Sequence, residues 1–105
     1  MSGKSRRQQL EALLALEPDD PELRYCVAME YVAEGQDDEA ARRLGELIGT
    51  APGYVPAYLQ AGRTLLRLGR DEEAKQVLTS GAHQARQAGN DHAAEEMLGL
   101  ATSIE

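Results

Sequence analysis

The sequence matches itself when it is shifted by 34 residues, and this internal repeat limits the fold more than any other feature. The matched positions are small, chain-breaking or apolar: Leu10–Leu44–Leu78, Leu13–Leu47, Pro18–Pro52, Gly35–Gly69, Asp37–Asp71, Glu39–Glu73 and Ala40–Ala74. A period of this length is typical of arrays in which helical hairpins stack on one another. We therefore predict an all-α solenoid of antiparallel helix pairs.

The composition favours the same architecture. The chain has 105 residues, of which 42% are hydrophobic, and it contains no Phe or Trp. Alanine and leucine suit thin, closely packed helices, whereas a sheet core would draw on aromatic and β-branched residues. A chain of this length is expected to form one domain, residues 1–105.

Proline and glycine breaks divide this domain into about six predicted helices. The expected pieces are an N-terminal half-repeat helix (5–17), a first full unit (21–52), a second unit with an extended second helix (55–88) and a C-terminal capping helix (91–103). In the first helix, the spacing of Leu10, Leu13 and Leu14 predicts one packed apolar face. Asp20 and Asp37 are predicted to cap the helices that follow them.

Small residues recur where two helices of a unit should meet. Ala28 and Gly62 are predicted to face the neighbouring helix from one side, and Ala40 and Ala74 from the other. Only a small side chain at these positions lets two helix backbones approach closely. A larger side chain at Gly62 is therefore expected to overpack the contact.

The residues at these fixed positions resemble the tetratricopeptide repeat family over about residues 6–86. At the positions of the family pattern, the second unit offers Tyr58, Ala61, Gly62, Leu65, Ala74 and Leu78, and the first offers Val27, Ala28, Tyr31, Ala40, Leu44 and Pro52. Arg24, Leu65 and Arg86 depart from the family's aromatic, tyrosine and closing proline. The resemblance implies a right-handed α-solenoid that serves as a non-catalytic protein-interaction module or adaptor.

The resemblance also implies a binding surface, because partners of this family usually lie in the concave groove formed by the first helix of each unit. When the family's groove positions are transferred to the aligned positions of this sequence, they fall on Glu22, Tyr25, Met29, Val32, Leu59, Arg63, Leu66 and Arg67. The apolar floor for a peptide or helix would be formed by Tyr25, Met29, Leu59 and Leu66. Arg63 and Arg67 would receive a carboxylate. The competing interpretation is that some of these side chains pack against flanking helices, and that the N-terminal helix covers part of the groove.

The identity of the partner stays open. Some members of the family bind the acidic tails of heat-shock chaperones through a lysine and asparagine clamp, but the matching positions here hold Tyr25, Met29, Leu59 and Arg63. That partner is therefore not predicted. The alternative function is a homodimeric structural or assembly subunit, in which the same apolar surface pairs with a second copy.

The charge and hydropathy patterns exclude other partner classes. A formal charge of −7 repels phosphate backbones, so we do not expect binding to nucleic acid. The N-terminal apolar stretch is interrupted by Glu11 and Pro18, and no run is long enough to span a membrane. With a single cysteine that cannot form an internal disulfide, these features indicate a cytoplasmic protein.

No residue pattern points to catalysis, a metal or a cofactor. His83 and His92 are predicted to lie on different helices without neighbouring ligands, and Cys26 is interpreted as a small apolar filler. The acidic clusters recur at helix starts, where capping and the helix dipole explain them. Nucleophile, phosphate-loop and zinc-protease motifs are absent from the sequence. An enzyme would need ligands or a cleft that the sequence does not display.

Overall fold

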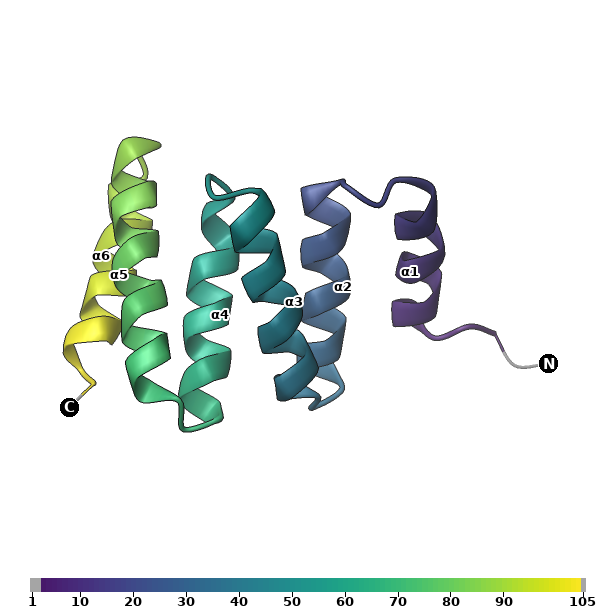
Figure 1. Cartoon of the computed structure of the whole chain (residues 1–105), viewed down its shortest axis with the longest axis horizontal. Coiled ribbons are helices and arrows are strands. Elements are labelled where there is room, and N and C mark those ends of the chain that lie inside the picture. Colours follow the sequence, from purple (N-terminus) through teal and green to yellow (C-terminus); the bar gives the residue numbers. More distant parts are fainter. Residues whose placement is uncertain (1–2, 105) are drawn as a thin grey trace.

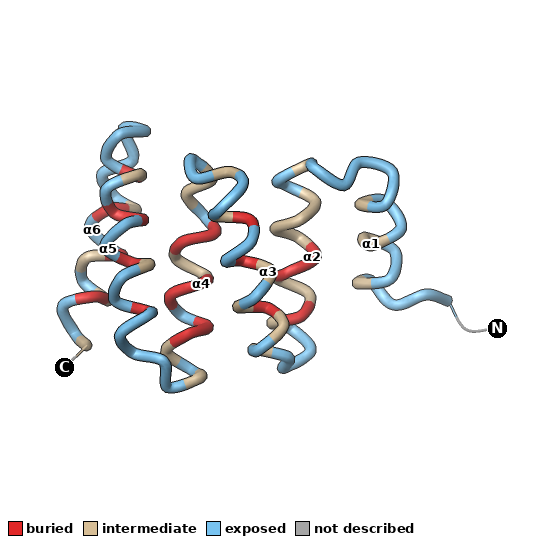
Figure 2. Tube along the Cα trace, in the orientation of Figure 1, coloured by how far each residue is buried: buried red, intermediate tan, exposed pale blue. Residues whose placement is uncertain are grey.

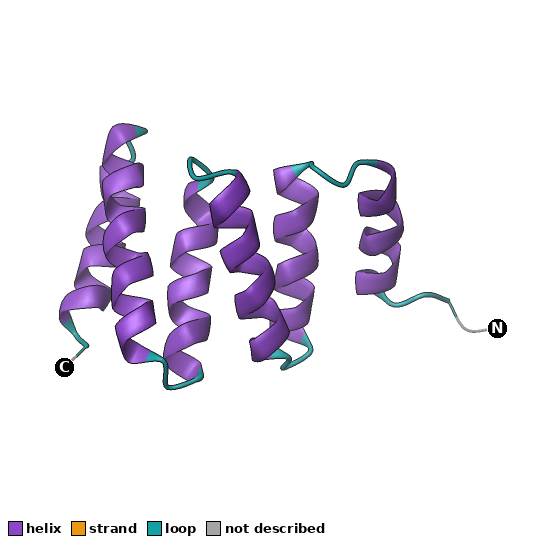
Figure 3. Cartoon of the chain, viewed as in Figure 1, coloured by secondary structure: helices purple, strands orange, loops and turns teal. Residues whose placement is uncertain are grey.

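Six helices follow one another as a row of antiparallel neighbours in the computed structural model, which describes residues 3–104 (Figure 1). They are α1 (Arg6–Leu16), α2 (Pro21–Ala33), α3 (Asp37–Thr50), α4 (Val55–Arg67), α5 (Asp71–Gln87) and α6 (Asp91–Thr102). The row is elongated, measuring 48 × 28 × 20 Å, and the described residues contain helices and loops but no strand (Figure 3). The predicted all-α repeat solenoid is confirmed.

Side-chain caps start three of the helices. The Asp20 carboxylate accepts hydrogen bonds from the backbone N–H groups of Glu22 and Leu23, at 2.9 and 3.2 Å, directly before Pro21. Ser5 and Asn90 cap α1 and α6 in the same way.

The prediction that Asp37 caps α3 is wrong. The N-cap position of α3 is Gln36, whose side chain makes no capping hydrogen bond, and Asp37 is the first residue of the helix. Its negative charge still lies at the positive end of the helix dipole. Its carboxylate is bound by Arg67 of α4, so it links α3 to α4.

Three glycines with positive φ end α2, α4 and α5. Gly35, Gly69 and Gly89 have φ of 76°, 76° and 78°, a region that glycine enters without steric cost. At the first of these turns the N–H of Gln36 donates to the carbonyl of Tyr31, and equivalent bonds close the other two. The third turn explains why α5 has 17 residues where α3 has 14: a glycine cap ends it, rather than the Pro-Gly turn that follows α3.

The core follows the inner faces of α2 to α6, as Figure 2 shows. Ala28, Ala40 and Ala74 are fully buried, and a side chain added at Gly62 would overlap the Leu78 side chain of α5. The predicted close contacts are therefore confirmed. Gly81 is a further close contact, because a side chain there would overlap atoms of α4 and α6.

Helix α1 is attached differently, because none of its residues is buried. Leu10 and Leu14 are partly buried against the cluster of Val27, Tyr31 and Ala40. Leu13, which was expected on the same packed face, is 52% exposed, so this expectation is wrong. The physical reason is that α1 packs against α2, while Leu13 and Leu16 face a side that no helix of residues 3–104 covers.

Candidate partner-binding surface

The seven predicted site residues lie on two helices of the row. Three come from α2 and four from α4: Tyr25, Met29, Val32, Leu59, Arg63, Leu66 and Arg67. All of the apolar members are partly buried and both arginines are exposed. Val32 packs against the Val27 cluster, and Leu59 packs against the core shared by α5 and α6. These two side chains thus support the core while keeping part of their surface open.

Tyr25 links α2 to the residue that directly precedes α4, Tyr54. Its ring lies 5.4 Å from the ring of Tyr54, measured between centroids, at an interplanar angle of 51°. Both tyrosines pack against the cluster that contains Ala28, Leu47 and other residues of α2 to α4. Burial raises the pKa of the Tyr25 hydroxyl above its ordinary value. Tyr25 is therefore held in a fixed position with only part of its ring available.

Both arginines of the predicted site are already paired with carboxylates of the chain. Arg63 donates to Glu96 of α6 at 2.9 Å, and Arg67 binds both carboxylate oxygens of Asp37 at 3.1 Å. The arginine side chains are 44% and 45% exposed. A carboxylate of a partner would therefore replace an existing carboxylate at each position.

Sequence reasoning missed an apolar hollow of about 620 Å³ at the N-terminal end of the molecule. Its lining comes from α1, the loop between α1 and α2, α2 and the loop before α4: Leu13, Leu16, Glu17, Asp20, Glu22, Leu23, Tyr25, Cys26 and Tyr54. Leu13 and Leu16 are the exposed large hydrophobic residues of the described chain. Tyr25 is the one residue of the seven-residue predicted site that lines the hollow. Glu22, which was predicted as a groove position, lines it as well.

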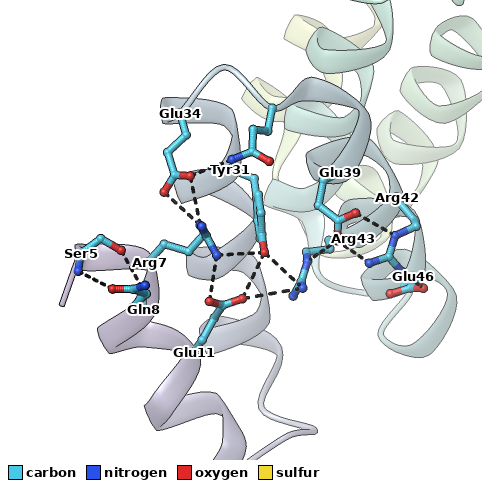
Figure 4. A network of polar contacts seen from close by, with 11 residues as sticks. Ser5, Arg7, Gln8, Glu11, Tyr31, Glu34, Glu39, Arg42, Arg43 and Glu46 are labelled. Carbon is cyan, nitrogen blue, oxygen red and sulfur yellow. Dashed lines mark hydrogen bonds and ion pairs between the residues drawn. The ribbon is translucent and has the colours of Figure 1, made fainter.

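A polar cluster joins α1 to α2 and α3 (Figure 4). The hydroxyl of Tyr31 donates to Glu11 at 3.1 Å and accepts from Arg7 at 3.1 Å and from Arg43 at 3.4 Å. The two guanidinium groups lie over the Tyr31 ring, 4.5 and 4.7 Å from its centroid. We call Arg7, Glu11, Tyr31 and Arg43 the tyrosine clamp.

Further ion pairs surround the tyrosine clamp. Arg7 also binds Glu34 at 3.0 Å, and hydrogen bonding to that carboxylate raises the pKa of the guanidinium. On α3, hydrogen bonds from Arg42 and Arg43 lower the pKa of the Glu39 carboxyl to about 2. Charged groups therefore carry much of the contact between α1 and the rest of the chain.

The remaining candidate residues do not assemble into a site. His83 and His92 are exposed on α5 and α6, and Cys26 lies partly buried in the wall of the hollow. Within residues 3–104 no group of three or more His, Cys, Asp or Glu side chains is arranged to hold a metal ion. The helices in this range are also too short or too polar to cross a lipid bilayer.

Comparison with known proteins places this architecture in a family. Tetratricopeptide repeat models match residues 31–98 and residues 2–54. The chain is 30% identical to a tetratricopeptide repeat domain protein from Salinibacter ruber, over 84% of this chain and 89% of that one, with a TM-score of 0.78. A Bordetella parapertussis protein is 27% identical over 96% of this chain and 88% of that one, with a TM-score of 0.81.

The chain therefore belongs to the tetratricopeptide repeat family, whose members are generally non-catalytic and mediate protein–protein interaction. The protein MamA shares the fold at a TM-score of 0.58, with 22% identity over 92% of this chain and 61% of its own. No curated protein matches the sequence.

Proposed function

We propose that the chain is a non-catalytic adaptor that binds a peptide or helix of a partner protein along α2 and α4. The observation that carries this proposal is the composition of the surface. Helices α2 and α4, which both pack against α3, present partly open apolar side chains beside two exposed arginines, as described above. Apolar floors with a few fixed charges are the usual design for holding an extended or helical segment.

The apolar members supply affinity in this proposal. Tyr25, Met29, Leu59 and Leu66 each have part of their side chain open, and a bound segment would bury the remainder. Burial of apolar surface contributes roughly 25 cal/mol per Å² before the costs of association. Because Tyr25 and Leu59 are already packed against the core, they lose little further side-chain freedom on binding.

The arginines would set the orientation of the partner by exchanging carboxylates. Exposed ion pairs contribute only about 0–1 kcal/mol, so replacing Glu96 or Asp37 by a carboxylate of the partner costs little. Arg67 binds Asp37 through two nitrogens, and a partner's carboxylate has the same geometry. A segment with a suitably placed acidic residue would therefore bind in one direction.

Quantitative affinity capture tests the proposal. The Tyr25→Ala, Leu59→Ala double variant is compared with the wild type and with a Lys75→Ala, Thr79→Ala control on the exposed face of α5. The recovery of specific partners should fall at least about tenfold with the first variant, which is equivalent to about 1.4 kcal/mol of binding free energy. With the control variant the recovery should stay unchanged. Circular dichroism checks that both variants keep their helices. Equal recovery of every partner by all three proteins would contradict the proposed surface.

The alternative is that the same apolar surface pairs two copies of the chain as a homodimer. Analytical ultracentrifugation over a range of concentrations separates the two functions. A stable dimer that loses its association in the Tyr25→Ala, Leu59→Ala variant would replace the adaptor proposal. If the chain is still a monomer at the highest concentration, the homodimer is excluded.

A further inference from the structure

The hollow beside α1 corresponds to a surface that a helix covers in the next unit. Leu47 is the counterpart of Leu13 under the 34-residue shift, and it is fully buried with Ala28 of α2 and Ala57 of α4. Leu13 is 52% exposed. Ala57 is likewise fully buried, while its counterpart Leu23 lines the hollow. The surface around Leu47 and Ala57 is thus covered, whereas the equivalent surface around Leu13 and Leu23, which we call the wall of the hollow, is open.

The helix that covers the equivalent surface in the next unit is α2. It covers the junction of α3 and α4 with Tyr25 and Ala28, an apolar pair three residues apart on one helix face. Tyr25 packs there against the ring of Tyr54. The junction of α1 and α2 has no such covering helix among the described residues, and the hollow is the space that remains.

We propose that this hollow is a second binding site, which takes an amphipathic helix of a partner protein with basic residues beside its apolar face. The helical form follows from the repeat, since a helix covers the equivalent junction one unit further along. The apolar face would cover Leu13, Leu16 and Leu23. This site overlaps the surface on α2 and α4 only at Tyr25 and the flanking Glu22.

The charge of the partner helix follows from the wall residues that differ between the units. Glu17 and Asp20 occupy the positions that Ala51 and Tyr54 hold in the next unit, and Glu22 adds a third acid. No basic residue lines the hollow. A helix seated on this wall therefore needs Lys or Arg side chains near its apolar face to complement the charge.

The same charges argue against a second copy as the occupant. A contact between two hollows would bring the acids of both copies together. The last helix of another copy, α6, exposes Asp91, Glu95 and Glu96, so it would also place acids against acids. Like charges repel each other in such a contact, which favours a basic partner of a different sequence.

Cys26 offers a direct test, because it is the only cysteine and it lines the hollow. The probe is a synthetic amphipathic helical peptide with Leu and Ala on one face and Lys beside it. The control peptide carries Glu in place of Lys. The rate of Cys26 alkylation by iodoacetamide is measured with each peptide. At four times its Kd, the lysine peptide should slow alkylation about fivefold, and the effect should weaken with salt.

Two protein variants locate the protection. The Leu13→Ser, Leu16→Ser variant removes exposed side chains, so the fold should persist while protection by the lysine peptide is lost. The Met29→Ser, Leu66→Ser variant changes the other surface and should retain the protection. The proposal is overturned if millimolar lysine peptide leaves the rate unchanged, if the glutamate peptide protects equally, or if the Leu13→Ser, Leu16→Ser variant is still protected. It is also overturned if sedimentation shows that the chain alone forms a dimer that Leu16→Ser dissociates.

Discussion

The two ends of this helical row are built in opposite ways. At the C-terminal end, α6 buries Ala94, Met97 and Ala101 against α5, and its exposed positions are polar or glycine. At the N-terminal end, α1 buries no residue, is held by the tyrosine clamp and exposes Leu13 and Leu16. A terminal helix closes such a row when its outer face is polar. By this measure the row is closed at α6 and open at α1.

The largest effect is expected from Met97→Ala, which tests the apolar attachment of α6. Met97 is fully buried and its sulfur lies in the contact at Gly81. Removing a buried side chain of this size costs about 2–5 kcal/mol, measured by urea unfolding. The matched variant on the other end, Leu13→Ala, should change stability by less than about 0.5 kcal/mol. Similar losses for both variants would remove the contrast between the ends.

Gly62→Leu tests the close packing between the two ends. The added side chain would overlap Leu78 in the contact of α4 with α5, and overpacking of this kind costs roughly 1–3 kcal/mol. The control is Gly45→Ala on α3, where an added Cβ meets no atom within 4 Å. Thermal unfolding should separate the two variants clearly. An unchanged melting temperature for Gly62→Leu would contradict the close contact.

Tyr31→Phe tests the polar attachment of α1. The variant removes the hydroxyl that links Glu11, Arg7 and Arg43, at an expected cost of about 1 kcal/mol. Amide hydrogen exchange in α1 should quicken about fivefold, since 1 kcal/mol is a factor of about five. Exchange in α6 should stay the same, and added salt should quicken exchange in α1 in the wild type. Equal changes in both helices would mean that α1 is not a separate unit of stability.

The smallest effect is the titration of Glu39, beside the tyrosine clamp. Its folded pKa of about 2 lies below its ordinary value of 4.5, chiefly through the hydrogen bond from Arg42. The stabilisation from this carboxylate is therefore complete above about pH 4.5 and is lost as the pH falls toward 2. The pKa of its counterpart on α5, Glu73, is also lowered, because Arg70 donates a hydrogen bond to this carboxylate. The pKa values of both carboxyls are measured by NMR titration. The Arg42→Gln variant should raise the pKa of Glu39 toward its ordinary value and leave that of Glu73 unchanged.

Most of the fold could be predicted because it rests on local features that recur every 34 residues. Glycines with positive φ end three helices, and Ala28, Ala40, Gly62 and Ala74 occupy the close contacts that the period indicates. Backbone sterics and helix geometry act within a few residues, so they are visible in the chain itself. The prediction for Asp37 failed because a carboxylate at a helix start can cap that helix or bind a neighbouring arginine, and only the fold brings Arg67 close.

The candidate sites depended much more on tertiary structure. The periodicity of α1 made Leu10, Leu13 and Leu14 equivalent, but burial depends on which neighbours are present. In the part of the chain that the structure describes, no helix covers Leu13. Likewise, nothing local could show that Arg63 pairs with Glu96, 33 residues away in the chain. The sequence by itself determined the repeat, the helices and the family. Only the tertiary structure decided which charges pair and which apolar faces stay open, because these depend on groups brought together from distant segments.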